Sequence, residues 1–290
     1  MTSAPRARSM LLAALLLGVV AVWGWTFVVV KDAIAIHGVL PFLAVRFTLG
    51  AACLGVICAR RIDWRTFGTG AAIGLVLGAG FLLQTLGLAR TTASNTGLIT
   101  GLFVIFAPLA NRLFFGVRIR AMLWAAIALS LIGLLLLTGS GPSGNGSGEM
   151  LTLGCAAMFG LHVALLDRFA KGHDAVVLTF GQLASAAALF LIFCAGQSAP
   201  LLPPPGVWPA LIITGVFASA VAFLIQTYVQ QHLNAVQTAM ILLAEPIFAV
   251  LFGCLLHGDR MTLLQIIGGV IMIATMSLVE LRGQKPGTTR

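Results

Sequence analysis

Charged side chains are scarce in this chain. Only 9% of its 290 residues are charged, while 59% are hydrophobic and the mean hydropathy is +1.05. A soluble globular domain carries about 25% charged residues, so this composition excludes a soluble enzyme or binding module. It predicts an all-α protein that crosses a membrane many times.

The residues that build common catalytic and metal sites are also few. The five cysteines all fall inside apolar stretches, their number is odd, and no two have the C-x-x-C spacing. This pattern argues against a disulfide framework and against a zinc site. The sequence also lacks the clustered His, Asp and Glu that a membrane enzyme would need near one face. We therefore expect no enzymatic activity, no cofactor and no metal.

Long apolar runs dominate what is present. Ten of them are long enough to cross about 30 Å of hydrocarbon as helices. The predicted spans are 10–30, 40–59, 67–88, 93–115, 121–138, 150–167, 175–195, 208–230, 236–256 and 262–281.

The basic residues between these spans are distributed unevenly. If the N-terminus is cytoplasmic, one face receives Arg6, Arg8, Arg60, Arg61, Arg65, Arg112, Arg118, Arg120, Arg168, Lys171, Arg282, Lys285 and Arg290. The other face receives only Lys31, Arg90 and Arg260. Positive charge collects on cytoplasmic loops, so both termini are predicted to be cytoplasmic in a multi-pass plasma (inner) membrane protein. The net charge of +9 thus encodes orientation, and nucleic-acid binding is not expected.

The two halves of the chain repeat each other. Residues 17–24 match 153–160 at a shift of 136 (153 − 17), and residues 81–85 match 223–227 at a shift of 142 (223 − 81). We place the six-residue difference in the proline-rich loop 200–209. Two homologous halves of five helices each must lie in opposite orientations in a bilayer, an architecture typical of alternating-access transporters. The predicted units are 1–138, a Gly/Ser-rich linker 139–149, and 150–290.

One acidic residue falls deep inside a span. Glu245 lies about 15 Å from the inner end of the ninth helix, directly before Pro246. A carboxylate near the middle of the bilayer defaults to a functional role, here as a partner for a substrate ammonium or a coupling proton. The alternative is a structural acid bonded to backbone that the proline frees.

Other polar or aromatic residues inside spans are candidates for substrate contact. Gln84 and Gln226 are repeat mates, and Tyr228 adds polarity near the second. Trp25 or Phe27 in the first span offers an aromatic face to a ligand, and His162 lies in the sixth span. The alternatives are hydrogen bonds between helices for the glutamines, an outer aromatic belt for Trp25, and packing for His162.

The fourth and ninth spans have the least regular sequences. Asn95 and Thr96 open the fourth and Gln237 opens the ninth, and Pro108 and Pro246 follow in their interiors. Polar starts followed by a proline indicate broken helices that line a cavity. The fifth and tenth spans are nearly featureless and are interpreted as scaffold.

A buried arginine is assigned a structural role. Arg46 lies about six residues into the second span, and its mate at a shift of 136 is Gln182 (182 − 46). The charge is therefore not repeated in the second half. An arginine at that depth can reach the interface or brace a neighbouring helix.

Taken together, several of these motifs resemble the drug/metabolite transporter superfamily, and more closely its ten-helix EamA-type members. They are Trp23-Gly24-x-x-Phe27, Arg46, Glu245-Pro246 and Gly258-Asp259. The resemblance covers essentially the whole chain and implies ATP-independent export or exchange of small metabolites across the inner membrane, amino acids often among them. It also implies a central cavity lined by helices one, three, four, six, eight and nine.

The chain departs from relatives of that superfamily in three respects. Gly116-Val117 lacks the acid of its mate Gly258-Asp259, and the first span lacks the glutamate that small four-helix multidrug members use for proton coupling. The ninth and tenth spans also lack the deep basic residues of sugar-phosphate relatives. These departures argue against that form of proton antiport and against phosphorylated substrates.

We therefore expect a secondary transporter that exports amino acids or similar small amphipathic metabolites by alternating access. The alternative is a carrier for multidrug or lipophilic-cation efflux, with Glu245 and aromatic faces as cation hosts. A passive channel would not require the inverted repeat. The expected partners are the small-molecule substrate and the lipid bilayer, and the protein is expected to be a monomer or a homodimer.

Overall fold

The computed structural model describes residues 3–116, 121–138, 146–196, 200–233, 238 and 241–283. All regular elements in these residues are helical. They are α1 (Ser3–His37), α2 (Val39–Cys58), α3 (Trp64–Leu88), α4 (Ala93–Thr100), α5 (Phe103–Phe115), α6 (Ala121–Thr138), α7 (Ser147–Phe169), α8 (Ala175–Ala195), η1 (Pro205–Val207), α9 (Trp208–Ile212), η2 (Ile213–Val221), α10 (Ala222–His232), α12 (Glu245–Leu256) and α13 (Leu263–Gly283).

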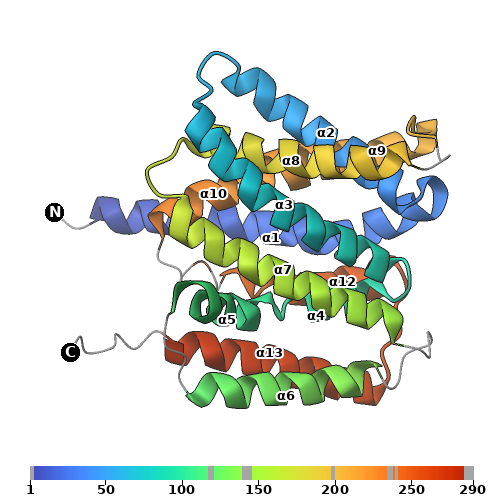
Figure 1. Ribbon diagram of the computed structural model, residues 1–290. Helices are drawn as coiled ribbons and strands as arrows, with labels where there is room; N and C mark the ends of the chain where they lie inside the picture. The colour runs from blue at the N-terminus through green and yellow to red at the C-terminus, as the bar shows by residue number, and fades with distance from the viewer. Residues whose placement is uncertain are drawn as a thin grey trace.

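These helices form ten membrane segments, which confirms the predicted fold class. Seven segments in the described residues are long and apolar enough to span a membrane, counting α4 with α5 and the run Pro205–His232 as one segment each. The helices α6, α12 and α13 provide the other three. They run nearly side by side, with α6 and α13 paired at one edge (Figure 1).

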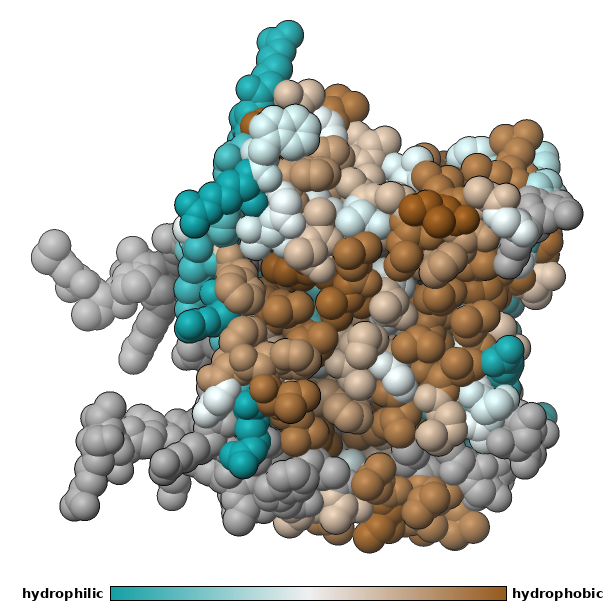
Figure 2. All heavy atoms as spheres, in the orientation of Figure 1, coloured by the Kyte–Doolittle hydropathy of each residue, from teal (hydrophilic) through white to brown (hydrophobic). Residues whose placement is uncertain are grey.

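The surface has the pattern expected of a protein surrounded by lipid. Apolar side chains cover the flank of the bundle, while hydrophilic residues gather along the edge where α1 begins (Figure 2). We call this edge the N-face and the other end of the bundle the opposite face. In Figure 1, α1 begins and α13 ends at the N-face.

The first helix is longer than the sequence predicts. The predicted span ends at residue 30, whereas α1 continues past Lys31 and Asp32 to His37. It ends at Gly38, whose φ of 82° is a left-handed conformation that glycine adopts without strain. The backbone rather than the charge therefore terminates this helix.

The inverted repeat is visible in how helices cross. A Cβ atom at Gly24 in α1 would lie 2.9 Å from the backbone N of Ala249 in α12. A Cβ atom at its mate Gly160 in α7 would lie 2.8 Å from the backbone N of Ala107 in α5. Ala107 and Ala249 are themselves mates at a shift of 142 (249 − 107). The same close crossing is thus built once in each half, and only glycine permits it.

A helix break is also repeated in both halves. Between α4 and α5, Leu102 N–H donates to the carbonyl of Ile99, three residues back instead of four. At a shift of 142 (244 − 102), Ala244 N–H donates in the same way to the carbonyl of Ile241, just before α12. Pro246 follows the second break directly, but Pro108 lies inside α5, six residues beyond the first. Prolines therefore do not set the position that the two breaks share.

A π-helix accounts for one residue of the change in repeat shift. Gly74 packs on the carbonyl of Gln182, and Gly215 packs on the carbonyl of Arg46, the mate of Gln182, which makes the two glycines equivalent at a shift of 141 (215 − 74). Phe81 lies seven residues beyond Gly74 and its mate Phe223 lies eight residues beyond Gly215, so the shift there is 142, and the π-helix η2 lies across this interval. A π-bulge inserts a residue into a helix. One of the six extra residues of the second half therefore lies in η2. The prediction that all six lie in the loop 200–209 was wrong by this one residue.

Candidate functional site

A central cavity lies between the two halves. Its aromatic wall residues are Trp23, Phe27, Phe81, Phe103, Phe159 and Phe223. Its aliphatic wall residues are Val30, Leu77, Leu88, Val163 and Leu242. Its polar wall residues are Thr26, Arg46, Gln84, Thr85, His162, Gln226 and Glu245.

Four of the aromatic residues form a symmetric cluster. The ring centroids of Trp23 and Phe223 lie 5.1 Å apart, and those of their repeat mates Phe159 and Phe81 also lie 5.1 Å apart. Phe81 and Phe223 meet edge to face at 5.8 Å, so the pseudo-twofold axis passes between them. Trp23 is fixed further by its Nε1, which donates to the carbonyl of Ala218 at 2.9 Å. Both halves therefore contribute two rings each to this cluster at the centre of the cavity, which we call the aromatic chamber.

The helix breaks place two different residues at equivalent positions in the cavity. Glu245 is the first residue of α12 and Phe103 is the first residue of α5, and they are mates at a shift of 142 (245 − 103). Both line the cavity. Glu245 is 7% exposed and has no hydrogen bond or ion pair to another described residue. One half of the repeat thus contributes an aromatic ring where the other contributes an unpaired carboxyl group.

The two repeated glutamines line the same cavity but are not equally bonded. Gln84 donates through Nε2 to Thr100 Oγ1 at 3.3 Å. The mate of Thr100 is Leu242, which has no hydroxyl, and Gln226 Oε1 is buried without a partner among the described residues. A buried amide oxygen without a hydrogen bond is costly, so Gln226 is available to a water molecule or a ligand.

His162 belongs to a hydrogen-bonded chain on the wall of the cavity. Its Nε2 lies 2.8 Å from Gln182 Oε1, and Gln182 Nε2 donates to Thr227 Oγ1 at 3.4 Å. Its ring meets Phe223 edge to face at 6.1 Å. His162 therefore lines the cavity, and the amide of Gln182 holds its ring.

Arg46 also lines the cavity. Its Nε donates to Ser219 Oγ at 3.0 Å, and its guanidinium carbon lies 4.7 Å from the centroid of the Phe81 ring and 5.5 Å from that of Phe47. Only 3% of the residue is exposed. The arginine that was assigned a bracing role is thus part of the cavity wall.

Four candidates from the sequence lie elsewhere. Trp25 and Tyr228 are not among the residues that line the cavity, and Tyr228 is 40% exposed with its ring 4.2 Å from that of His232. Asn95 and Thr96 are buried at the start of α4, beyond the cavity. Gln237 lies outside the described residues.

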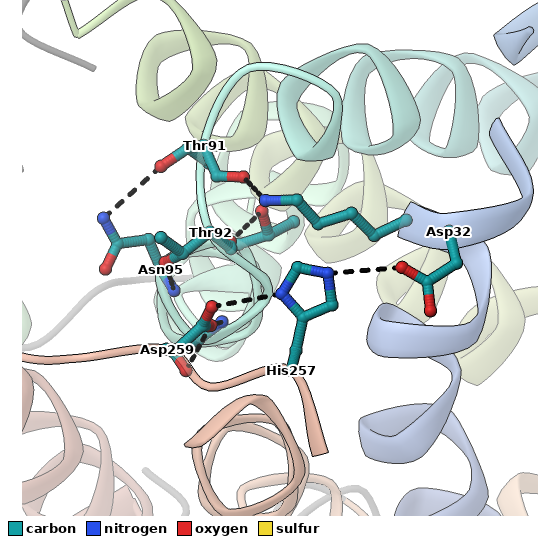
Figure 3. A network of polar contacts seen from close by, with 9 residues as sticks. Asp32, Thr91, Thr92, Asn95, His257 and Asp259 are labelled. Atoms are coloured by element: carbon teal, nitrogen blue, oxygen red, sulfur yellow. Dashed lines mark hydrogen bonds and ion pairs between the residues drawn. The ribbon is translucent and has the colours of Figure 1, made fainter. Parts of the chain in front are cut away.

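A polar network ties helices together at the opposite face (Figure 3). Lys31 Nζ donates to the carbonyl of Thr91, and His257 lies 3.3 Å from Asp32 Oδ1 and 3.5 Å from Asp259 Oδ1. Asp259 also accepts from the backbone N–H of Ser94 at 2.9 Å and from its hydroxyl. The aspartate of the Gly-acid motif, which follows the end of α12, therefore binds the first turn of α4.

A second group of contacts extends this network to α7. Thr91 Oγ1 donates to Glu149 Oε1 at 2.6 Å, and Asn95 Nδ2 lies 3.5 Å from the same oxygen. Asn95 therefore takes part in a structural contact between the halves.

Sequence reasoning missed the aromatic chamber. Trp23, Phe81, Phe159 and Phe223 were not proposed as site residues, although the repeat alignment pairs Trp23 with Phe159 and Phe81 with Phe223. In both pairs the two repeat mates are aromatic, and this agreement was the signal that could have predicted the chamber.

Comparison with known proteins agrees with this architecture. The model of the EamA-like transporter family matches the chain twice, over residues 10–139 and 146–281. An uncharacterized transporter of Archaeoglobus fulgidus is 32% identical over 264 residues, which are 91% of this chain and 84% of that protein. The uncharacterized inner membrane transporter YedA of Escherichia coli is 24% identical over 88% of this chain and 86% of its own length.

A solved structure shares the fold. A protein of known crystal structure, 18% identical in sequence, superposes on this chain with a TM-score of 0.66. The match covers 94% of this chain and 99% of that protein. The double family match and the similarity to the archaeal transporter carry the assignment, and they confirm the resemblance seen in the motifs. This multi-pass membrane protein belongs to the EamA-like transporter family, within the drug/metabolite transporter superfamily.

Proposed function

We propose that the protein exports amino acids or similar small amphipathic metabolites by alternating access, without ATP hydrolysis. The observation that carries this proposal is Glu245, an unpaired carboxyl group on the wall of an aromatic cavity between inverted halves. A carboxylate suits a substrate ammonium, and the aromatic rings suit an apolar side chain. The free Oε1 of Gln226 adds an acceptor on the same wall.

A second candidate function rests on the same residues. The rings of Trp23, Phe81 and Phe223, in the cavity that Glu245 also lines, would also suit a lipophilic cation, because aromatic rings attract cations. The multidrug alternative is therefore kept as a competing proposal.

Competition for uptake into proteoliposomes separates the two. Labelled L-leucine is the probe. We expect unlabelled neutral amino acids to compete for its uptake. Tetraalkylammonium ions of similar size should compete at least about tenfold more weakly, a difference of about 1.4 kcal/mol in binding free energy. Preferential competition by the tetraalkylammonium ions would favour the multidrug function instead.

We also propose that the protein resides in the plasma (inner) membrane with the N-face in the cytoplasm. The hydrophilic edge in Figure 2 and the basic loops of that face support this orientation. In a cysteine-free background, Leu202→Cys on the opposite face, which is 79% exposed, should react with an impermeant thiol reagent in intact cells. Arg60→Cys on the N-face should react only after lysis. The reverse pattern would invert the topology.

A further inference from the structure

We propose that Arg46 binds the carboxylate of the substrate. This inference rests on the proposed function and narrows it, because it commits the cavity to a zwitterion that offers an ammonium group to Glu245 and a carboxylate to Arg46. It assigns a specificity-determining role to a residue that sequence reasoning treated as structural.

The surroundings of Arg46 leave its binding edge free. Arg46 Nε donates to Ser219, and the guanidinium carbon lies over the rings of Phe81 and Phe47. The two terminal nitrogens have no hydrogen-bond partner among the described residues. Since Arg46 lines the cavity, these donors are available to a ligand there. A guanidinium held this way presents the planar fork that matches a carboxylate in bidentate geometry.

Arg46 also lacks a charge partner among the described residues. No carboxylate of a described residue lies within 4.0 Å of its nitrogens, and Glu245 is not paired with it although both line the cavity. A buried charge that is not compensated is strongly unfavourable. Among the described residues, the cavity therefore holds one cationic and one acidic residue without a charge partner, which is the arrangement that a zwitterion completes.

The repeat shows that this availability is specific to one half. Gln182, the mate of Arg46, is occupied by His162 and Thr227. Ser219, which positions Arg46, comes from η2, the π-helix that has no counterpart in α3. The π-helix that positions Arg46 thus occurs in one half only. The site is therefore asymmetric, and the two charged groups of the substrate have different partners.

The same arrangement disfavours the multidrug alternative. A lipophilic cation could use Glu245, but it would leave the Arg46 charge uncompensated in the same cavity. A ligand that carries both an ammonium group and a carboxylate satisfies both residues at once.

A binding experiment with matched ligands tests the role of Arg46. L-leucine and L-leucinamide share the ammonium group and the side chain, but the amide lacks the carboxylate. For the purified full-length chain, we expect leucinamide to bind about thirtyfold more weakly than leucine, and Arg46→Gln to weaken leucine by a similar factor, as for truncation of a buried charge pair. Leucinamide should lose less than about threefold in the variant, because its partner group is already absent.

The outcomes separate this inference from the proposed function. If Arg46→Gln weakens both ligands equally, or if unmodified protein binds leucine and leucinamide equally, Arg46 does not bind the carboxylate, and the export of amphipathic metabolites still stands. The second comparison needs no variant, so it holds even if Arg46→Gln fails to fold. If the unmodified protein binds 3-methylbutan-1-amine and tetraethylammonium but not leucine, the proposed function fails as well. Arg168→Gln, the same substitution at an arginine that lies 5.8 Å from the Phe115 ring and does not line the cavity, serves as the control and should not change the ratio of the two ligands.

Discussion

Replacing Glu245 by glutamine should weaken the binding of ammonium-bearing substrates about a hundredfold, as expected when one partner of a buried charge pair is removed. Glutamine keeps the shape and the hydrogen-bonding capacity of the side chain and removes only its charge. Because Glu245 has no partner among the described residues, the yield of folded protein should not change. Dissociation constants for L-leucine and for 3-methylbutan-1-amine, measured alongside the elution profile of the purified protein, check both statements.

The control applies the same substitution to another buried carboxyl group. Glu149 is 1% exposed, is bonded to Thr91 and does not line the cavity, so Glu149→Gln should leave both dissociation constants within about threefold of the parent. If Glu245→Gln transports normally while Glu245→Ala does not fold, Glu245 is a structural acid tied to the helix break at Pro246. That result would remove its role in binding.

Replacing Gly24 by leucine should abolish folding of the bundle. Its Cβ atom alone would lie 2.9 Å from the backbone N of Ala249, so α1 and α12 would have to separate. Overpacking of a tight contact costs about 1–3 kcal/mol for smaller insertions, and a leucine side chain adds several atoms at a contact between backbones. We expect little monodisperse protein by size-exclusion chromatography, and the same outcome for Gly160→Leu at the mated crossing.

Gly18→Leu is the matched control for this prediction. Gly18 lies on the same helix, six residues before Gly24, and no atom lies within 4 Å of the position of its Cβ. Leucine has a higher helix propensity than glycine by less than about 1 kcal/mol, so the yield should be unchanged or slightly higher. Normal yields for both Gly24→Leu and Gly160→Leu would contradict the close crossings that define the inverted repeat.

The sequence predicted the architecture because its signals are local or repeated. Hydrophobic runs located the helices, and the match of residues 81–85 with 223–227 paired Gln84 with Gln226 before the cavity was known. The helix ends were less predictable. The α1 helix extends past Lys31 and Asp32 because a long helix can carry charges at the end of a membrane span, where their side chains reach polar partners such as Thr91 and His257.

Which residues of a helix face the cavity and which face lipid could not be predicted from the sequence alone. Trp23 and Trp25 are two residues apart, which is about 200° around a helix, so one lines the cavity and the other does not. Tyr228 and Gln226 are separated in the same way, and only Gln226 is in the wall. In an apolar helix, the residues toward lipid and toward the cavity have similar hydropathy, so periodicity does not distinguish them.

Only one of the two prolines lies next to a helix break, because Pro246 follows the break before α12 and Pro108 lies inside α5. The backbone changes its hydrogen bonding at Leu102 and at Ala244, and this shared position places Phe103 and Glu245 in the cavity. Pro108 marks no such change. The break is better located by the repeat, because it is common to both halves, than by either proline.

Solute counterflow in proteoliposomes tests most directly whether the cavity between the halves carries substrate across the membrane. Vesicles that contain the purified protein and concentrated unlabelled L-leucine are diluted into a trace of labelled L-leucine, without ATP and without an ion gradient. Alternating access predicts a transient accumulation of label above the external concentration, which Glu245→Gln abolishes and Glu149→Gln preserves. Equilibration of label without any overshoot, unaffected by Glu245→Gln, would indicate passive leakage and contradict the account.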